Sequence, residues 1–551
     1  MKKENSIRIL ALALSTLVLL SGCSSAAETA GAASSGETDT ASQADGSASS
    51  EEAVLLEAST LFSDRDLEGS YDASEATLIT LTGDTASCSS SSVAISGGTI
   101  TITDEGVYLL SGTLSDGQII VSADENDKVQ LVLDGASVTS STSAALYCLQ
   151  ADKVFVTLAE QSENTLANGG TYTAIDENNI DAVIFSKTDL TLNGSGTLIV
   201  NAAAGHGIVS KDELTIAGGS YEITAEQHGM TGKDSVAISS GTFVINAGQD
   251  GIHAENTDDT SLGGLYIADG SFTIVSGGDC ISASGALQID AGDFTLTAGG
   301  GSESVTMQTS QMDFGAGRGQ QTNVTQEETQ EEDTTSQKGI KAEGSYIITD
   351  GTFSIDSADD CLHAGGDLLI ESGSFDLRSG DDAVHSDAAV TIQDGTFSIP
   401  YCYEGIEGLS VTVNAGSYTI TSYDDGVNAA GGADGSGFGG IRQEQFSSGS
   451  DSFIIINGGD FTIVSSGDCL DSNGDLTING GTLQLTCNGN GNTAIDADGS
   501  YTNNGGDVTT NDGSESGSGF GAGGGMNGGG SRGGAGKMAG GTGGLSGETA
   551  S

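Results

Sequence analysis

Residues 351–399 read GTFSIDSADDCLHAGGDLLIESGSFDLRSGDDAVHSDAAVTIQDGTFSI. Within this stretch the motif Gly-x-Phe-x-Ile/Leu occurs three times and places Phe353, Phe375 and Phe397 22 residues apart. Apolar and polar residues alternate over short runs that end at Gly, Asp or Asn, which is typical of β-strands. A period of this length indicates a solenoid, in which each repeat packs only on its neighbours.

The same position recurs along most of the chain, at spacings of mostly 21 or 22 residues, and the larger gaps contain insertions. We therefore expect an all-β fold, a single-stranded right-handed parallel β-helix with about 22 residues per rung. Equivalent positions of stacked strands lie about 4.8 Å apart, so the aromatic residues should form an internal ladder. The positions are Tyr221, Phe243, Phe272, Phe294, Phe353, Phe375, Phe397, Tyr418 and Phe461, with Leu483 as an aliphatic variant.

The charge of the chain is strongly unbalanced. Its 551 residues contain 16 Lys and Arg against 77 Asp and Glu, which gives a formal net charge of −61. Such a field repels nucleic acid and anionic membrane surfaces and attracts cations, so we expect no nucleic-acid partner. No CxxC motif occurs among the cysteines, which argues against a zinc site.

The first residues predict where the protein works. Residues 1–22 combine a basic start with a short apolar run and lead into Leu-Ser-Gly-Cys, which resembles the bacterial lipobox. We expect a lipoprotein signal peptide over 1–22, lipidation of Cys23, and a flexible linker over 23–53. The protein would then lie on the extracellular face of the bacterial membrane, at the cell surface, and contact the membrane through the lipid anchor only.

One β-helix domain is expected over 54–513, with insertion loops at about 299–337 and 430–451. Residues 62–72 should lead into an N-terminal cap, because the end of a solenoid must be covered. Residues 514–551 are rich in Gly and should form a disordered tail. We expect the protein to be a monomer.

Acidic residues recur seven positions after the aromatic residue, and a second possible ligand follows three positions later. Ser282 is the exception at the second position. The first set is Asp250, Asp279, Asp360, Asp382, Glu404, Asp425 and Asp468. The second set is His253, His363, His385, Glu407, Asn428 and Asp471. Three rungs double the acid with Asp359, Asp381 and Asp424.

Two interpretations of this pattern remain open. Stacked carboxylates about 5 Å apart repel each other, and Ca²⁺ relieves this because it takes six to eight oxygen ligands. Alternatively, the acids form solvated turns at the starts of strands. The histidines are predicted as metal ligands too, but they are unusual ligands for calcium, so some of them would instead brace carboxylates or contact a bound ligand.

Two further groups suggest a binding surface. A lysine column follows earlier strands and either forms a cationic strip for a sugar acid or makes surface pairs worth under about 1 kcal/mol each. The column is Lys187, Lys211 and Lys233. Three tyrosines near the acids either stack on sugar rings or only cover the surface. They are Tyr401, Tyr403 and Tyr423.

The lipobox and a series of five motifs indicate a resemblance to a known family. The motifs are D-G-I-H at 250–253, D-D-C-L-H at 359–363, D-D-A-V-H at 381–385, Y-E-G-I-E at 403–407 and D-D-G-V-N at 424–428. The chain resembles the secreted clostridial carbohydrate-binding β-helix proteins, which are similar in fold to pectate lyases. The resemblance covers about 62–497. It implies a right-handed parallel β-helix, bound calcium, and binding of plant cell-wall polysaccharide, polygalacturonate or cellulose.

The calcium ligands that the resemblance implies fall on the acids of the rungs. The rung of Asp279 departs from the family pattern, because Ser282 stands at its second position. The implied ligands are Asp250, Asp359, Asp360, Asp381, Asp382, Glu404, Asp424, Asp425 and Asp468.

Three functions fit these observations. The first is a lipid-anchored, calcium-binding carbohydrate-binding protein. The second is a calcium-dependent polysaccharide lyase, which needs a cationic base beside the metal, and only Arg378 and Lys341 are candidates. Because cations are scarce and dispersed, we expect no enzyme. The third is a structural spacer or adhesin.

Overall fold

The computed structural model describes residues 58–307, 336–430 and 452–516. These belong to the second of two compact units, which divide the chain into 1–52 and 53–551. The signal peptide, Cys23, the linker and nearly all of the tail lie outside the described residues, so they stay predictions. Among the described residues, no helix is long and apolar enough to cross a membrane.

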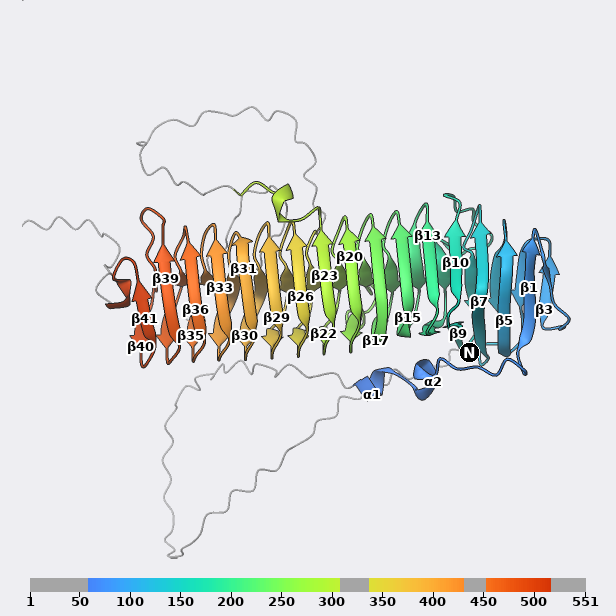
Figure 1. The fold of residues 1–551 in the computed structure, drawn as a ribbon, viewed down its shortest axis with the longest axis horizontal. Coiled ribbons are helices and arrows are strands. Elements are labelled where there is room, and N and C mark those ends of the chain that lie inside the picture. The colour runs from blue at the N-terminus through green and yellow to red at the C-terminus, as the bar shows by residue number, and fades with distance from the viewer. Residues whose placement is uncertain (1–57, 308–335, 431–451, 517–551) are drawn as a thin grey trace, which may run out of the picture. The chain divides into compact units, whose positions relative to one another are not determined.

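The fold is all-β, and parallel strands lie side by side in three stacks from β1 (Thr77–Gly83) to β41 (Asp507–Thr510) (Figure 1). Each pass of the chain contributes one strand to each stack, so equivalent residues pair from coil to coil. Phe353, for example, pairs with Phe375, which pairs with Phe397. The predicted stacking of parallel strands is confirmed, and the handedness of the coil stays a prediction.

The first stack carries the aromatic residues. Its strands are β10 (Glu163–Asn168), β13 (Thr197–Ala202), the second halves of β15 (Glu213–Ala225) and β17 (Ser235–Ala247), β20 (Ser271–Ser276), β23 (Asp293–Ala298), β26 (Thr352–Ser357), β29 (Ser374–Ser379), β31 (Thr396–Cys402), β33 (Ser417–Ser422), β36 (Asp460–Ser465), β39 (Thr482–Cys487) and β41.

The second stack follows the first after a short turn. Its strands are β8 (Leu146–Gln150), β11 (Ala182–Ser186), β14 (His206–Ser210), β16 (Met230–Gly232), β18 (Ile252–Ala254), β21 (Ile281–Ala283), β24 (Ile340–Ala342), β27 (Leu362–Ala364), the first halves of β30 (Val384–Ile392) and β32 (Ile406–Val413), β34 (Val427–Ala429) and β37 (Leu470–Ser472).

The third stack closes each coil. Its strands are β9 (Lys153–Leu158), β12 (Asp189–Gly194), the remaining halves of β15, β17, β30 and β32, β19 (Gly264–Ile267), β22 (Leu287–Ile289), β25 (Tyr346–Ile348), β28 (Leu368–Ile370), β35 (Phe453–Ile456), β38 (Asp475–Ile478) and β40 (Tyr501–Asn503). The N-terminal coils add β2 (Ala86–Ser87), β3 (Val93–Ser96), β4 (Thr99–Ile102), β5 (Gly106–Leu114), β6 (Gln118–Ser122) and β7 (Lys128–Ser140).

The predicted aromatic ladder is confirmed. From Tyr221 to Phe461 successive rings stack with centroids 4.4–5.2 Å apart and planes within 12° of parallel. The glycine two residues before each ring is explained by close packing. At Gly373, where φ is 138°, an added Cβ would lie 2.9 Å from the Phe375 ring. The motif therefore encodes both the turn and the ring that fills the coil.

Cysteines serve as small core residues, as their repeat position suggests. The Sγ atoms of Cys280, Cys361 and Cys469 are buried and lie 3.0–3.2 Å from the hydroxyl of the serine four residues earlier. The seven cysteines of the described chain are all free, so no disulfide staples these coils.

The N-terminal segment differs from expectation. The short helices α1 (Ala58–Leu61) and α2 (Asp64–Leu67) lie along the side of the coils instead of leading directly into an end cap (Figure 1). Asp66 is buried and contacts Lys153 Nζ at 2.7 Å and the Thr191 hydroxyl at 2.5 Å. Phe62 packs on Tyr266. This docking joins residues that are far apart in sequence, so local patterns do not reveal it.

Both ends of the predicted domain also need adjustment. At the N-terminal end, the segment 93–102 is an antiparallel hairpin of β3 and β4, although β4 then pairs with β6 in parallel. At the other end, Ser514–Ser516 forms the 3₁₀ helix η2, held by the Asp512 carboxylate, which accepts from the Ser514 amide and hydroxyl. The ordered coil therefore extends three residues past 513. A second 3₁₀ turn, η1 (Ser302–Ser304), lies at the start of the 299–337 insertion.

Candidate functional site: two columns of polar side chains

Strand pairing aligns the polar residues around the second stack in two columns. Column 1 lies two residues before the first apolar residue of each strand, and column 2 lies one residue after it. Column 1 is His206, His228, Asp250, Asp279, Lys338, Asp360, Asp382, Glu404, Asp425 and Asp468. Column 2 from β18 onward is His253, Ser282, Lys341, His363, His385, Glu407, Asn428 and Asp471, followed by Asp496 through the Leu470–Ile495 bridge.

Four members of these columns escaped the sequence analysis. His206, His228 and Lys338 were missed because only acids were counted, and because the 299–337 insertion separates Lys338 from the preceding Phe294. Asp496 was missed because a longer turn precedes it. Aligning the rungs on the apolar residue of the next strand, such as Ile340 for Lys338, identifies all four.

Several column 1 acids have a structural role between neighbouring rungs. A side-chain oxygen of the acid accepts the backbone N–H of the next column 1 residue. This bond measures 2.9 Å from Asp279 N to Asp250, 3.1 Å from Asp382 N to Asp360, and 2.6 Å from Asp468 N to Asp425. These bonds join different rungs and therefore differ from the solvated turns of the alternative interpretation, and the second oxygen of each acid is left for other partners.

The two histidines of column 1 also accept the backbone amide of the next rung, and they do so without a charge. His206 Nδ1 accepts the His228 amide at 3.2 Å, and His228 Nδ1 accepts the Asp250 amide at 3.1 Å. Burial lowers the pKa of both imidazoles to about 4, so both are neutral acceptors. The bond to the amide of the next rung thus needs an acceptor, not a negative charge.

The column 2 histidines brace carboxylates of their own rung. Nδ1 of His253 lies 2.6 Å from Asp250 Oδ2, and the corresponding distance is 2.9 Å for His363 with Asp360. His385 Nδ1 lies 3.1 Å from Asp382. These nitrogens face carboxylate oxygens, which fits a bracing role for His253, His363 and His385, and their role as metal ligands stays a prediction.

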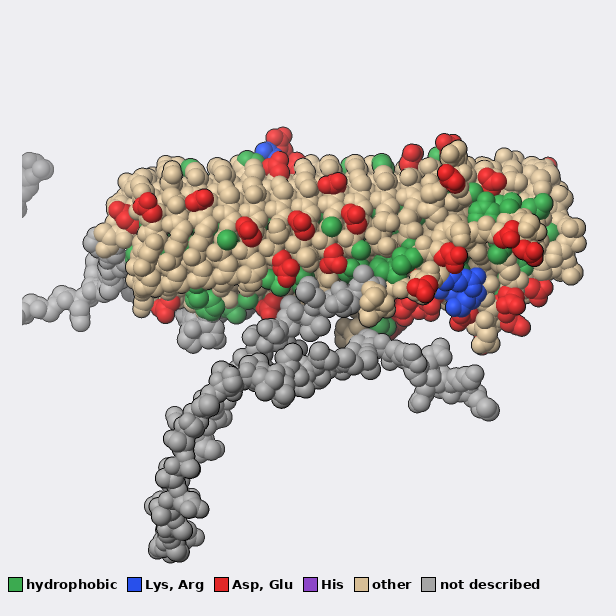
Figure 2. Space-filling view, turned by 60° about the horizontal axis from the view of Figure 1, so that its bottom comes forward, with side chains coloured by type: hydrophobic (Ala, Val, Ile, Leu, Met, Phe, Trp, Pro, Cys, Tyr) green, Lys and Arg blue, Asp and Glu red, His purple; other side chains and the backbone are tan. Residues whose placement is uncertain are grey.

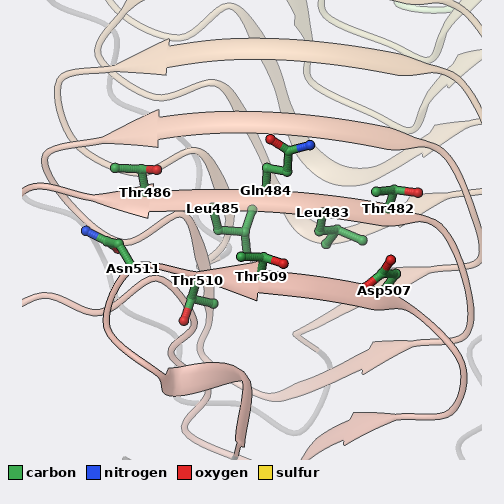
Figure 3. Close-up of a pocket in the computed structure, with 9 residues that line it drawn as sticks. All are labelled: Thr482, Leu483, Gln484, Leu485, Thr486, Asp507, Thr509, Thr510 and Asn511. Atoms are coloured by element: carbon green, nitrogen blue, oxygen red, sulfur yellow. The ribbon is translucent and has the colours of Figure 1, made fainter.

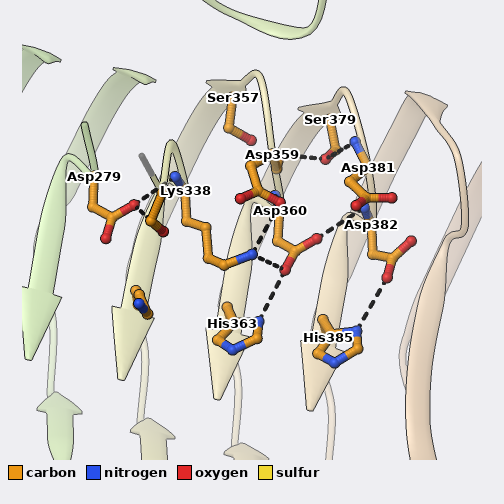
Figure 4. A network of polar contacts seen from close by, with 12 residues as sticks. Asp279, Lys338, Ser357, Asp359, Asp360, His363, Ser379, Asp381, Asp382 and His385 are labelled. Atoms are coloured by element: carbon orange, nitrogen blue, oxygen red, sulfur yellow. Dashed lines mark hydrogen bonds and ion pairs between the residues drawn. The ribbon is translucent and has the colours of Figure 1, made fainter. Parts of the chain in front are cut away.

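Lys338 is a buried cation inside column 1. Its Nζ lies 2.9 Å from Asp359 Oδ1 and 2.7 Å from Asp360 Oδ2, and its side chain is fully buried (Figure 4). Its backbone N–H donates to Asp279 Oδ1 at 2.7 Å. Burial lowers the pKa of Lys338 but the two carboxylates raise it more, so the ammonium stays charged. In turn the ammonium outweighs burial and holds the pKa of Asp360 well below its usual range.

His385 is a second internal cation, one rung further on. Its Nδ1 contacts both Asp382 and Glu407 at 3.1 Å, and its Nε2 lies 3.2 Å from Asp387. The imidazole is 1% exposed. Burial lowers its pKa, but the three carboxylates together raise it well above the usual value, so it is an imidazolium.

Beyond His385 the columns lose their cations. The described residues 379–430 and 452–516 contain seventeen Asp and Glu and neither Lys nor Arg. Burial and neighbouring carboxylates raise the pKa values of Glu404 and Asp425 well above their usual range, that of Asp468 to about 7 and that of Asp471 to about 6. The folded chain therefore concentrates negative charge here without a protein counter-ion.

The donors in this region fit calcium. One carboxylate oxygen from each of Asp468, Asp471 and Asp496 lies within 4.8 Å of the others. Asn428 donates to Glu404 at 2.9 Å, and its own carbonyl oxygen is buried without a hydrogen-bond partner. Carboxylate and amide oxygens are the ligands that calcium prefers.

A glycine leaves room for converging oxygens in the same place. A Cβ at Gly467 would collide with Oδ1 of both Asp424 and Asp425, so these two carboxylates point toward one small space. A second set, Asp382 of column 1 with His385 and Glu407 of column 2, suits calcium less because its imidazole is already charged.

The predicted lysine column is present on consecutive coils, because the residues just before the lysines pair in register. Lys187 and Lys211 are exposed and form no ion pair with any residue of the described chain, whereas Lys233 contacts Asp258 at 2.5 Å. Lys211 Nζ lies 5.5 Å from the Phe185 ring centroid. On the face seen in Figure 2, acidic side chains spread along the coils and Lys and Arg gather in few places.

The tyrosines do not form a common platform. Tyr403 is 4% exposed, so the prediction that its ring receives a sugar is wrong. Tyr401 and Tyr423 are partly exposed. The Tyr401 ring is covered by the Arg378 guanidinium, whose Cζ lies 5.5 Å from the ring centroid.

The two candidate bases of a lyase belong to different stacks. Arg378 is on β29 in the first stack and pairs in register with Tyr401, and Lys341 is on β24 in the second stack. Lys341 Nζ contacts Glu343 at 2.7 Å. The pairing register does not bring the two cations together.

A shallow recess lies over the last coils, between β39 and β41 (Figure 3). Its lining is mostly Thr, Gln, Asp and Asn side chains, and none of them belongs to column 1 or column 2. The recess lies at the exposed end of the first stack and is separate from the polar columns.

Comparisons with known proteins identify the family of the chain. The family model of carbohydrate-binding domain-containing proteins matches residues 96–383, more than half of the chain, and also 366–437. A carbohydrate-binding domain-containing protein of Acetivibrio thermocellus is 38% identical over 128 residues, which span 23% of this chain and 45% of that protein. A solved gadolinium derivative of the polysaccharide lyase-like protein from C. thermocellum is 33% identical, covers 41% of this chain and 92% of its own, and has a TM-score of 0.39. The chain belongs to the family of carbohydrate-binding domain-containing proteins.

Proposed function

We propose that this protein is a non-enzymatic carbohydrate-binding protein of the cell surface that holds calcium among the acids of its C-terminal coils. Membership of the family supports carbohydrate binding. The observation that supports calcium binding is the convergence of Asp468, Asp471 and Asp496 in a region of the described chain that has no Lys or Arg.

Electrostatics is the reason for assigning calcium to this region. Two like charges 4 Å apart repel by about 4 kcal/mol at an effective dielectric constant of 20. A divalent cation converts that repulsion into attraction and satisfies the Asn428 carbonyl as well. Of the predicted ligands, Glu404, Asp425, Asn428, Asp468 and Asp471 are the set to which we assign the ion.

Calcium also offers a way for a chain of net charge −61 to bind an acidic glycan. A uronate polymer is repelled by the protein field unless a cation bridges the two, or unless the glycan contacts the unpaired Lys187 and Lys211. A neutral glucan usually needs aromatic platforms, and the chain has no Trp. We therefore assign polygalacturonate ahead of cellulose.

The cellular location rests on the first residues. Lipidation of Cys23 would tether the protein to the outer face of the bacterial membrane through 23–53. This proposal is supported by the lipobox-like ending of the leader.

The test uses the full chain with polygalacturonate and, separately, cellulose, in calcium or in chelator. We expect calcium-dependent retention on polygalacturonate and no new absorbance from unsaturated products. Asp471→Asn should weaken retention, and Asp460→Asn is the matched control because Asp460 is an exposed acid of the neighbouring β36.

Each outcome separates the candidates. Rising absorbance would make the protein a lyase and direct mutagenesis to Arg378 and Lys341. Retention on cellulose alone would mean that the ligand is cellulose and not the acidic glycan. Binding of neither glycan would leave the spacer or adhesin function.

A further inference from the structure

Lys338 stands where its neighbours in the same column carry carboxylates. Its Nζ lies 2.7–2.9 Å from one oxygen each of Asp359 and Asp360, and no part of its side chain is exposed. A third carboxylate oxygen, from Asp381, lies within 4.8 Å of those two acids. The ammonium thus lies beside three converging acids, and Lys338 is the only lysine of column 1 in the described chain.

The surrounding hydrogen bonds are adjusted to a lysine. A lysine cannot accept a hydrogen bond, so it cannot receive the amide of the next rung as Asp250, Asp279 and Asp360 do. The Asp360 amide donates instead to Asp359 Oδ1 at 3.0 Å. Asp360 Oδ2 also contacts His363, and Asp360 Oδ1 accepts the Asp382 amide at 3.1 Å. The doubled acid therefore supplies the acceptor that Lys338 lacks.

We propose that the Lys338 ammonium takes the place of a calcium ion, so that the rungs around it hold no metal, and that Asp359, Asp360 and Asp381 form a latent calcium site that opens when the ammonium is removed. This inference deepens the proposed function and rests on it for the ions bound elsewhere. Removing one partner of a buried pair leaves an uncompensated charge, and a divalent cation with carboxylate ligands can compensate it.

The test counts ions and measures thermal stability in Lys338→Met, which removes the charge and keeps an unbranched side chain. We expect the variant to bind one calcium ion more than the unmodified protein by titration calorimetry. In chelator its Tm should fall, and calcium should restore it. Lys341→Met is the matched control, because Lys341 is three residues away, partly exposed and paired with Glu343. It should change neither the ion count nor the Tm recovery.

An unchanged ion count in Lys338→Met, with no extra recovery of Tm by calcium, would overturn the inference. If Lys338→Met fails to fold, Asp359→Asn in the otherwise unmodified chain tests the same claim. It should leave the ion count unchanged, because these rungs hold no calcium while Lys338 is present, and a lower count would contradict the inference. An unmodified protein that binds no calcium defeats the proposed function alone, since the gain in Lys338→Met is measured relative to it.

Discussion

The rungs around Lys338 and the rungs from Asp425 to Asp471 are built from the same repeat, yet they neutralise their acids differently. Around Lys338, an ammonium contacts Asp359 and Asp360 directly and lowers the pKa of Asp360. From Asp425 onward the described chain offers no Lys or Arg, and the pKa values of the acids are raised.

The difference separates two roles of one column position. The backbone role, accepting the amide of the next rung, is common to Asp250, Asp360 and Asp425 and is shared by neutral His228. The charge role varies along the stack, because a coil needs an acceptor but not a fixed charge. The repeat can therefore keep its fold while each rung either carries its own cation or relies on a bound one.

The largest expected effect comes from breaking the Lys338 pair. Asp360→Asn keeps an oxygen for the Asp382 amide but removes the charge that faces the ammonium. Removing one partner of a buried pair costs about 3–5 kcal/mol, and Asp359 still contacts the ammonium, so denaturant unfolding should show a loss of up to that size with or without calcium. Asp376→Asn, an exposed acid on β29, should stay within about 0.5 kcal/mol. A loss that appears only in the presence of calcium would mean that Asp360 binds calcium.

Removing calcium should destabilise the other region, the rungs from Asp425 to Asp471. A ligand present at 100 times its Kd stabilises the folded state by about 2.7 kcal/mol, so chelator should remove an amount of that order. Hydrogen exchange should quicken in β34 and β37, whose acids lose their ion, and stay unchanged in β24 and β27 beside Lys338. Equal loss of protection in all four strands would show that the two regions do not differ in their need for calcium.

The pH dependence should have opposite signs in the two regions when measured in chelator. The pKa values of Asp468 and Asp471 are raised to about 7 and about 6, so the folded chain keeps protons that the unfolded chain releases near pH 4. The folded state binds more protons than the unfolded state, and stability from these rungs therefore falls as pH rises from about 4 to about 7. Asp360 has a lowered pKa, so its contribution is present above about pH 4 and is lost below it.

Thermal melts across this range would measure the effect, and the double variant Asp468→Asn with Asp471→Asn provides the comparison. The fall in Tm between pH 4 and pH 7 should be smaller in the variant. A fall of the same size in both proteins would assign it to the remaining acids of the chain.

The fold was largely predictable because a short sequence repeat determines it. The Gly-x-Phe motif specifies a tight turn and an inward ring, and the 22-residue spacing from Phe353 to Phe397 brings successive rings into contact. Most acids of the two columns were found for the same reason. A repeat that stacks in register turns a sequence interval into a spatial neighbour.

The rest depended on contacts that no interval encodes. The insertion at 299–337 breaks the count of seven residues before Lys338, so its place between acids is visible only once β24 pairs with β27. The docking of α2 depends on Asp66 meeting Lys153 across the coils. The burial of Tyr403 could not be predicted either, because a turn can break the alternation of inward and outward residues.

The smallest expected effect concerns a third stretch, the exposed lysines of the N-terminal coils, and it shows which region contacts the glycan. Lys211→Gln removes one charge without an ion-pair partner in the described chain, so Tm should stay constant. Exposed charge contacts are worth about 0.2–1 kcal/mol, and retention on polygalacturonate should therefore weaken by about 1.4-fold to fivefold. Lys128→Gln, at a surface lysine already 3.6 Å from Asp152, should leave retention unchanged. If Lys211→Gln weakens retention more than Asp471→Asn does, the lysines carry the contact and calcium serves mainly the stability of the C-terminal coils.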